Sequence, residues 1–219
     1  MRVWTGRALI VAHPRRSTRQ KMVAGHFGLA AGVKSQAPGA PLWALMLASQ
    51  WLDVFFVPLF LMGIETIEPA DPTTPNAYGG GVIHAVYTHS LVGALLLSAL
   101  AGVLAWSLWG RRIGGVIAAV AFSHWLLDLV VHRPDLPILP GNAGGLPLLG
   151  FGLWAAPVVA AVVELVLVLG GAYLYYRRAT RLAPVTPTSS REHRRRVLTA
   201  SAVVTGLMLL TFILNVLGF

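Results

Sequence analysis

Long apolar runs separated by short polar stretches rich in Gly and Pro dominate this chain. Runs of about 20 apolar residues are long enough to cross a bilayer as helices, because each helical residue adds about 1.5 Å. The pattern predicts about six hydrophobic helices, five of them clear spans and the first too short for one. They cover Met22–Val33, Leu42–Ile64, Val82–Trp109, Ile113–Val131, Leu153–Tyr176 and Val197–Leu217. The predicted fold class is therefore all-α, a polytopic membrane helix bundle.

Composition supports a membrane protein and narrows its chemistry. Of the 219 residues 56% are hydrophobic and only 11% are charged, whereas soluble proteins carry about 25% charged residues. The net charge of +9 comes from arginine clusters beside apolar segments, which is typical of membrane topology, so we expect no nucleic-acid partner. The chain has no cysteine, so any metal site must use His, Asp or Glu.

The distribution of Lys and Arg predicts an orientation. Lys34, the Arg111-Arg112 turn and the 177–196 linker should be cytoplasmic, which leaves the acidic loop 65–81 and the stretch 134–150 outside.

Three parts of the chain are expected to differ in role: a basic arm at 1–21, a metal-site bundle at 22–150, and two C-terminal membrane helices at 151–219 joined by a basic linker. The arm carries six Lys/Arg and no acid, against the predicted topology, so we expect Met22 to be the natural start.

Ionisable residues interrupt the apolar helices where hydrocarbon is expected. His124, Asp128 and His132 follow one another at i, i+4 and i+8, so a helix presents them on one face. His84 and His89 are five apart, about 140° on a regular helix, so both can serve one site only if the first turn is irregular after the 79–81 glycines. Ionisable groups in hydrocarbon cost about 2.5–3.5 kcal/mol each, so such residues normally pair, face water or bind something.

These groups predict a metal site in the outer half of the bundle. A hairpin around the 34–41 turn places His26 and Asp53 at about the same depth. A His and Asp set without thiolate suits a divalent transition metal, with zinc favoured over manganese or iron, as one or two ions. The candidate ligands are His26, Asp53, His84, His89, His124 and Asp128.

Three further residues are candidates for catalysis. His132 and Arg133 lie at the outer membrane boundary, where Arg133 is a natural clamp for a phosphate oxygen and lipid-headgroup contact is the alternative for both. Glu164 stands alone in the middle of its helix, as a general base or outer ligand, or else as a protonated and hydrogen-bonded residue.

The motifs resemble a known family, the YdjM-like, LexA-regulated inner-membrane proteins described as metal-dependent hydrolases. The matching motifs are Gly25-His26, His84-Ala-Val-Tyr-Thr-His89-Ser90 and Ser123-His124 with Asp128, followed by a Pro-rich stretch at 136–140. The family's Asp-x-Asp-His motif is reduced here to Asp53-Val-Phe-Phe, and its Arg-Gly after the first histidine has become Ala-Val. More loosely, the chain is similar to the zinc-dependent phospholipases C. The resemblance implies a bacterial cytoplasmic (inner) membrane location.

We therefore expect a membrane-embedded metal-dependent hydrolase, a phosphoesterase in which metal-activated water attacks an ester of a lipid or amphiphilic substrate. The metal site should lie toward the outer face, with membrane lipids as partners and an oligomeric state that the sequence leaves open. Two alternatives remain: a cation or proton transporter using the same His and Asp cluster, and a catalytically inactive relative stabilised by metal. The apolar inner halves of the helices favour a one-sided pocket over a transport path.

Overall fold

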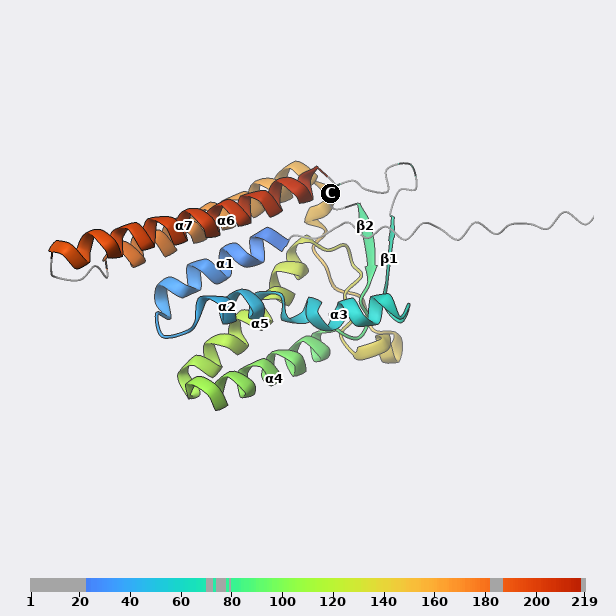
Figure 1. Cartoon of the computed structure of the whole chain (residues 1–219). Coiled ribbons are helices and arrows are strands. Elements are labelled where there is room, and N and C mark those ends of the chain that lie inside the picture. The colour runs from blue at the N-terminus through green and yellow to red at the C-terminus, as the bar shows by residue number, and fades with distance from the viewer. Residues whose placement is uncertain (1–22, 70–72, 74–77, 79, 182–186, 218–219) are drawn as a thin grey trace, which may run out of the picture.

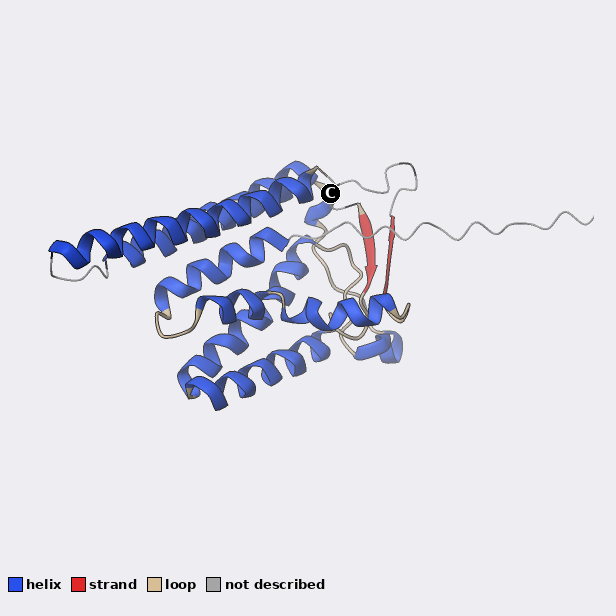
Figure 2. Cartoon of the chain, in the orientation of Figure 1, coloured by secondary structure: helices blue, strands red, loops and turns tan. Residues whose placement is uncertain are grey.

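The chain folds into a helical bundle with one small β-hairpin, in a computed structural model that describes residues 23–69, 73, 78, 80–181 and 187–217 (Figures 1 and 2). The arm at 1–21 and Met22 lie outside the described residues. In chain order the elements are α1 (Val23–Gln36), α2 (Leu42–Ser49), α3 (Trp51–Leu61), β1 (Thr66–Pro69), β2 (Gly81–His84), α4 (Leu91–Trp109), α5 (Arg111–Val131), the 3-10 turns η1 (Pro140–Gly145) and η2 (Leu153–Ala155), α6 (Pro157–Arg181) and α7 (Pro187–Val216).

Four of the described helices are long and apolar enough to cross a membrane, which supports the prediction of a membrane protein. They are α4, α5, α6 and the part of α7 from Arg194 to Val216. The bent pair α2 and α3 could make a fifth span. The helix predicted over Ile113–Val131 is confirmed as α5, whereas α1 is short, as expected.

Two predicted elements differ from the structure. The span expected over Leu42–Ile64 is broken at Gln50, where α2 and α3 meet at 48°. The helix expected from Val82 begins only at Leu91, because Ser90 caps it by accepting a hydrogen bond from the Gly93 amide. The residues before it form strand β2, which pairs antiparallel with β1 across what the sequence predicts as an exposed acidic loop.

Figure 1 places the connections of the bundle at two ends. The α1–α2 connection, the α4–α5 connection and the end of α6 form a first set at one end, and the β-hairpin lies at the other. The first set carries Lys34, Arg111, Arg112 and the arginines at the end of α6, so basic residues gather at one end of the bundle, as the predicted topology requires.

Close helix contacts position α1 beside α6. A side chain added at Gly28 would meet the Leu167 carbonyl oxygen at 2.4 Å, and one added at Gly171 would meet the Gly28 carbonyl oxygen at 1.8 Å. Only glycine permits this approach, in which small residues let two helix backbones meet. The contact fixes the start of α1, where His26 lies.

Candidate metal centre

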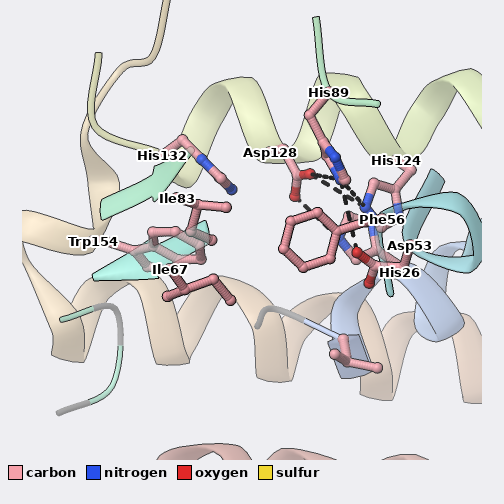
Figure 3. Close-up of a pocket in the computed structure, with 11 residues that line it drawn as sticks. His26, Asp53, Phe56, Ile67, Ile83, His89, His124, Asp128, His132 and Trp154 are labelled. Atoms are coloured by element: carbon pink, nitrogen blue, oxygen red, sulfur yellow. Dashed lines mark hydrogen bonds and ion pairs between the residues drawn. The ribbon is translucent and has the colours of Figure 1, made fainter. Parts of the chain in front are cut away.

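Three helices and one turn bring His and Asp side chains to a single buried cavity (Figure 3). His26 comes from the first turns of α1, Asp53 from the first turn of α3, and His89 from the turn before α4. His124 and Asp128 come from α5, one helical turn apart. The cavity has a volume of about 30 Å³ and is lined besides by His132 and by Phe56, Ile67, Ile83 and Trp154.

The ligand atoms converge at short distances. Nε2 of His124 lies 3.3 Å from Nε2 of His89 and 3.2 Å from an Asp128 oxygen. Nε2 of His89 lies 3.5 Å from the same Asp128 oxygen and 3.7 Å from Asp53. The second Asp128 oxygen lies 3.3 Å from Nε2 of His26, whose ring stacks on His124 at 4.0 Å.

These separations fit a bound metal ion. Ligands held about 2.0–2.1 Å from a tetrahedral zinc are about 3.3 Å apart, which is close to the distances among His89, His124 and Asp128. Two overlapping groups have the geometry to hold an ion, His26 with His124 and Asp128, and Asp53 with His89 and His124. His124 is common to both groups. The buried Nδ1 of His26 has no hydrogen-bond partner among the described residues.

Outer hydrogen bonds set the tautomers of two imidazoles. Nδ1 of His124 lies 2.7 Å from the Ser49 carbonyl oxygen, which can only accept, so this nitrogen carries the proton. The break between α2 and α3 follows Ser49 directly and leaves that carbonyl available. Thr88 donates its hydroxyl proton to Glu65, so Nδ1 of His89 must donate to Thr88. In its neutral form each of the two rings therefore directs an Nε2 lone pair into the cavity.

The charges around the cavity also favour a bound cation. Burial lowers the pKa of His89 to about 4, so this ring is neutral at pH 7. Two carboxylates line the same cavity, Asp128 buried and Asp53 partly buried, and carboxylates removed from water need a compensating positive charge. A divalent cation would balance both carboxylates and accept the converging lone pairs. The buried His and Asp groups could therefore hold a metal ion.

His84 does not join the other candidate ligands. It lies at the end of β2, paired in register with Thr66, and its side chain is 48% exposed. Its nearest charged partner is Glu68, at 4.0 Å. The expected irregular segment between His84 and His89 does form, but as a strand and a turn that direct His84 away from the cavity. The structure thus corrects the prediction for His84, which lies outside the cavity that His26, Asp53, His89, His124 and Asp128 share.

The three predicted catalytic residues have different positions. His132 lines the cavity, and its ring packs on Trp154 at 4.5 Å. Arg133 is not among the lining residues and donates to the Gly81 carbonyl oxygen, which anchors the start of β2. Glu164 is fully buried but also outside the lining. Its carboxyl group accepts hydrogen bonds from the Gly25 amide and from the Tyr78 hydroxyl. Burial raises the pKa of the Tyr78 hydroxyl above its usual range.

Glu164 is connected to the site through the start of α1. Its hydrogen bond to the Gly25 amide, at 3.1 Å, holds the helix start next to His26. A carboxylate at a helix N-terminus accepts an amide that lacks a partner within the helix and interacts favourably with the helix dipole. The structure thus shows Glu164 hydrogen-bonded and outside the cavity lining, while its protonation and a direct part in catalysis stay predictions.

Two acidic residues that sequence reasoning missed support the site. Glu65 is fully buried and accepts from the Tyr87 amide, the Thr88 amide and the Thr88 hydroxyl at 2.8–2.9 Å. Asp135 accepts from Nδ1 of His132 at 2.8 Å and from the Ile83 amide at 3.2 Å. The i, i+3 spacing of His132 and Asp135 could have indicated their contact. Nothing near Glu65 in the sequence indicated that Tyr87 and Thr88 are its partners.

The substitution Glu65→Gln tests whether Glu65 sets the tautomer of His89 through Thr88. In Glu65→Gln the new amide group would donate to Thr88, whose hydroxyl would then donate to Nδ1 of His89. The His89 proton would move to Nε2 and block the lone pair that faces the cavity. We expect zinc affinity, measured by chelator competition, to fall about 10- to 100-fold, as is usual for outer-shell changes.

The matched control is Glu68→Gln, the same chemical change at a side chain that is 67% exposed and near His84. It should leave zinc affinity unchanged. Equal affinities for wild type and Glu65→Gln would show that Glu65 does not set the His89 tautomer.

Comparison of the chain with protein-family models, with curated proteins and with solved structures gave no match.

Proposed function

We propose that this protein is a membrane-embedded metal-dependent hydrolase that cleaves a phosphoester or other ester of a lipid or amphiphilic substrate. One observation carries the proposal: His and Asp side chains that could hold a metal ion share a small cavity with His132, which is hydrogen-bonded to Asp135 behind it. The residues that meet there include those of the YdjM-like motifs, His26, His89, His124 and Asp128, and we propose membership of that family on this basis.

Zinc is the favoured ion for this donor set. The proposed ligands are imidazole nitrogens and carboxylate oxygens, with His124 shared by the two possible groups. A bound divalent ion would supply Lewis acidity and lower the pKa of coordinated water to about 7. His89 and His124 are pre-oriented for this by Thr88 and the Ser49 carbonyl.

His132 is the group that we propose to move protons. Its Nδ1 donates to Asp135, so Nε2 carries the lone pair in the neutral ring. Figure 3 shows the ring extending toward Asp128 from the other side of the cavity. A histidine oriented by a carboxylate can accept a proton from attacking water and return it to a leaving group.

The surrounding packing favours an enzyme over a transporter. Transport requires polar groups along a path through both halves of the membrane. Toward the basic end, the bundle is instead packed with small and aliphatic side chains, including Ala44, Leu45, Ala101 and Ile117. We propose that the basic end faces the cytoplasm of a bacterial cell and the site opens toward the outer face of its cytoplasmic membrane.

The test is turnover by detergent-purified protein stripped with a chelator and reloaded with zinc, manganese or iron. The substrates are mixed micelles of phospholipids, a chromogenic phosphodiester and a chromogenic carboxylic ester. We expect hydrolysis of an ester only after reloading, and none by Asp128→Asn. Stoichiometric metal without turnover of any substrate would contradict the hydrolase and support the inactive, metal-stabilised relative.

A further inference from the structure

A second polar pocket lies at the basic end of the bundle, away from the candidate metal centre. Its volume is about 270 Å³, and five of its six lining residues are polar. Ser35 and Gln36 come from the end of α1, and the remaining residues come from the last turns of α6. The α6 residues are Leu174, Arg177, Arg178 and Arg181.

The three arginines concentrate positive charge in this pocket. Arg177 and Arg181 are one turn apart on α6, and Arg178 flanks them. Within the described residues no ion pair neutralises any of the three, and Glu192, the next acid along the chain, pairs with Arg196. Lys34, at the same end, instead donates to the carbonyl oxygens of Pro38 and Ala40.

The pocket lies at the depth of lipid headgroups. α6 has 25 residues, so it is about 37 Å long at 1.5 Å per residue, more than the hydrocarbon thickness of about 30 Å. Its last turns therefore reach the interface. Tyr173 and Leu174, just before the arginines, are 59% and 42% exposed and extend the apolar helix surface up to the pocket.

We propose that this pocket binds the phosphate group of an anionic phospholipid from the leaflet at the basic end. Guanidinium groups bind phosphate oxygens through paired N–H donors, and basic pockets between membrane helices suit anionic headgroups. The exposed apolar surface beside Leu174 favours a lipid over free phosphate, because it offers contact for an acyl chain. This inference is independent of the proposed hydrolase.

Native mass spectrometry of the detergent-purified chain tests the site. Protein is incubated with phosphatidylglycerol or phosphatidylcholine, and the lipid-bound fraction is measured. We expect phosphatidylglycerol adducts that phosphatidylcholine does not give, and at least about fivefold fewer adducts in Arg177→Gln/Arg178→Gln/Arg181→Gln, as the loss of three charge-assisted contacts implies. If the triple variant does not fold, the three single variants replace it and should each lower binding.

The matched control is Arg194→Gln/Arg195→Gln/Arg196→Gln, which removes the same charge from exposed positions on α7 outside the pocket. It should retain the adducts. Equal losses in both triple variants would show diffuse surface attraction and overturn the site. Equal binding of both lipids, or displacement of phosphatidylglycerol by millimolar inorganic phosphate, would overturn the lipid assignment.

Discussion

Replacing His124 by Ala is expected to abolish stoichiometric metal binding. His124 is 2% exposed, belongs to both groups that could hold an ion, and directs Nε2 toward His89 and Asp128. Outer-shell changes typically cost about 10- to 100-fold in affinity, and loss of a shared ligand should cost more. Plasma mass spectrometry of purified protein should find about one or two equivalents in wild type, the range for one- and two-metal sites, and a trace in His124→Ala.

The matched control is His84→Ala, which removes the same side chain from the exposed end of β2. It should keep the wild-type metal content. Because a ligand that binds only the folded state stabilises it, a chelator should lower the melting temperature of wild type and His84→Ala but not of His124→Ala. Full metal content in His124→Ala would refute the proposed centre, and loss in His84→Ala alone would move it to the hairpin.

The part of the site that the sequence predicted rests on local periodicity. An i, i+4 pair on a long apolar run can only face one side of a helix, and His124 and Asp128 meet at 3.2 Å on α5. A hairpin argument from the 34–41 turn likewise brought His26 and Asp53 to one cavity. His89 joins them because its turn is tied to α5, where the Trp125 indole donates to the His89 carbonyl oxygen.

The remaining features depend on contacts between distant residues. The sequence predicts an exposed loop at Glu65, because Pro, Gly and acidic residues follow it. In the structure Glu65 is buried and accepts hydrogen bonds from three donors of Tyr87 and Thr88. The break at Gln50 lies in an apolar run without Gly or Pro at that point, so composition gave no sign of it. That break is what frees the Ser49 carbonyl for His124, 75 residues away.

The basic residues at one end of the bundle have two kinds of surroundings. Basic residues outside the bilayer were interpreted only as markers of orientation, and Lys34 fits that interpretation with a turn-stabilising role. Arg177, Arg178 and Arg181 satisfy the same topology rule while gathering around one polar pocket. A count of Lys and Arg residues does not distinguish Lys34 from the three arginines. The difference is that backbone carbonyl oxygens next to Lys34 accept its hydrogen bonds.

Replacing His132 by Gln is expected to lower kcat for ester hydrolysis about 10²- to 10⁴-fold while metal content stays at the wild-type level. This range is typical for loss of a general acid or base. His132 lines the cavity and is 3% exposed. Its Nδ1–H donates a hydrogen bond to Asp135, so Nε2 is free for proton transfer. Asp135→Asn should also lower kcat, because the amide no longer fixes the tautomer of the His132 ring.

Arg133→Gln, one residue away but outside the cavity lining, is the matched control for local disturbance and should retain most of the activity. Unchanged kcat in His132→Gln with bound metal would assign His132 a packing role against Trp154, whereas loss of metal would make it a ligand of the centre.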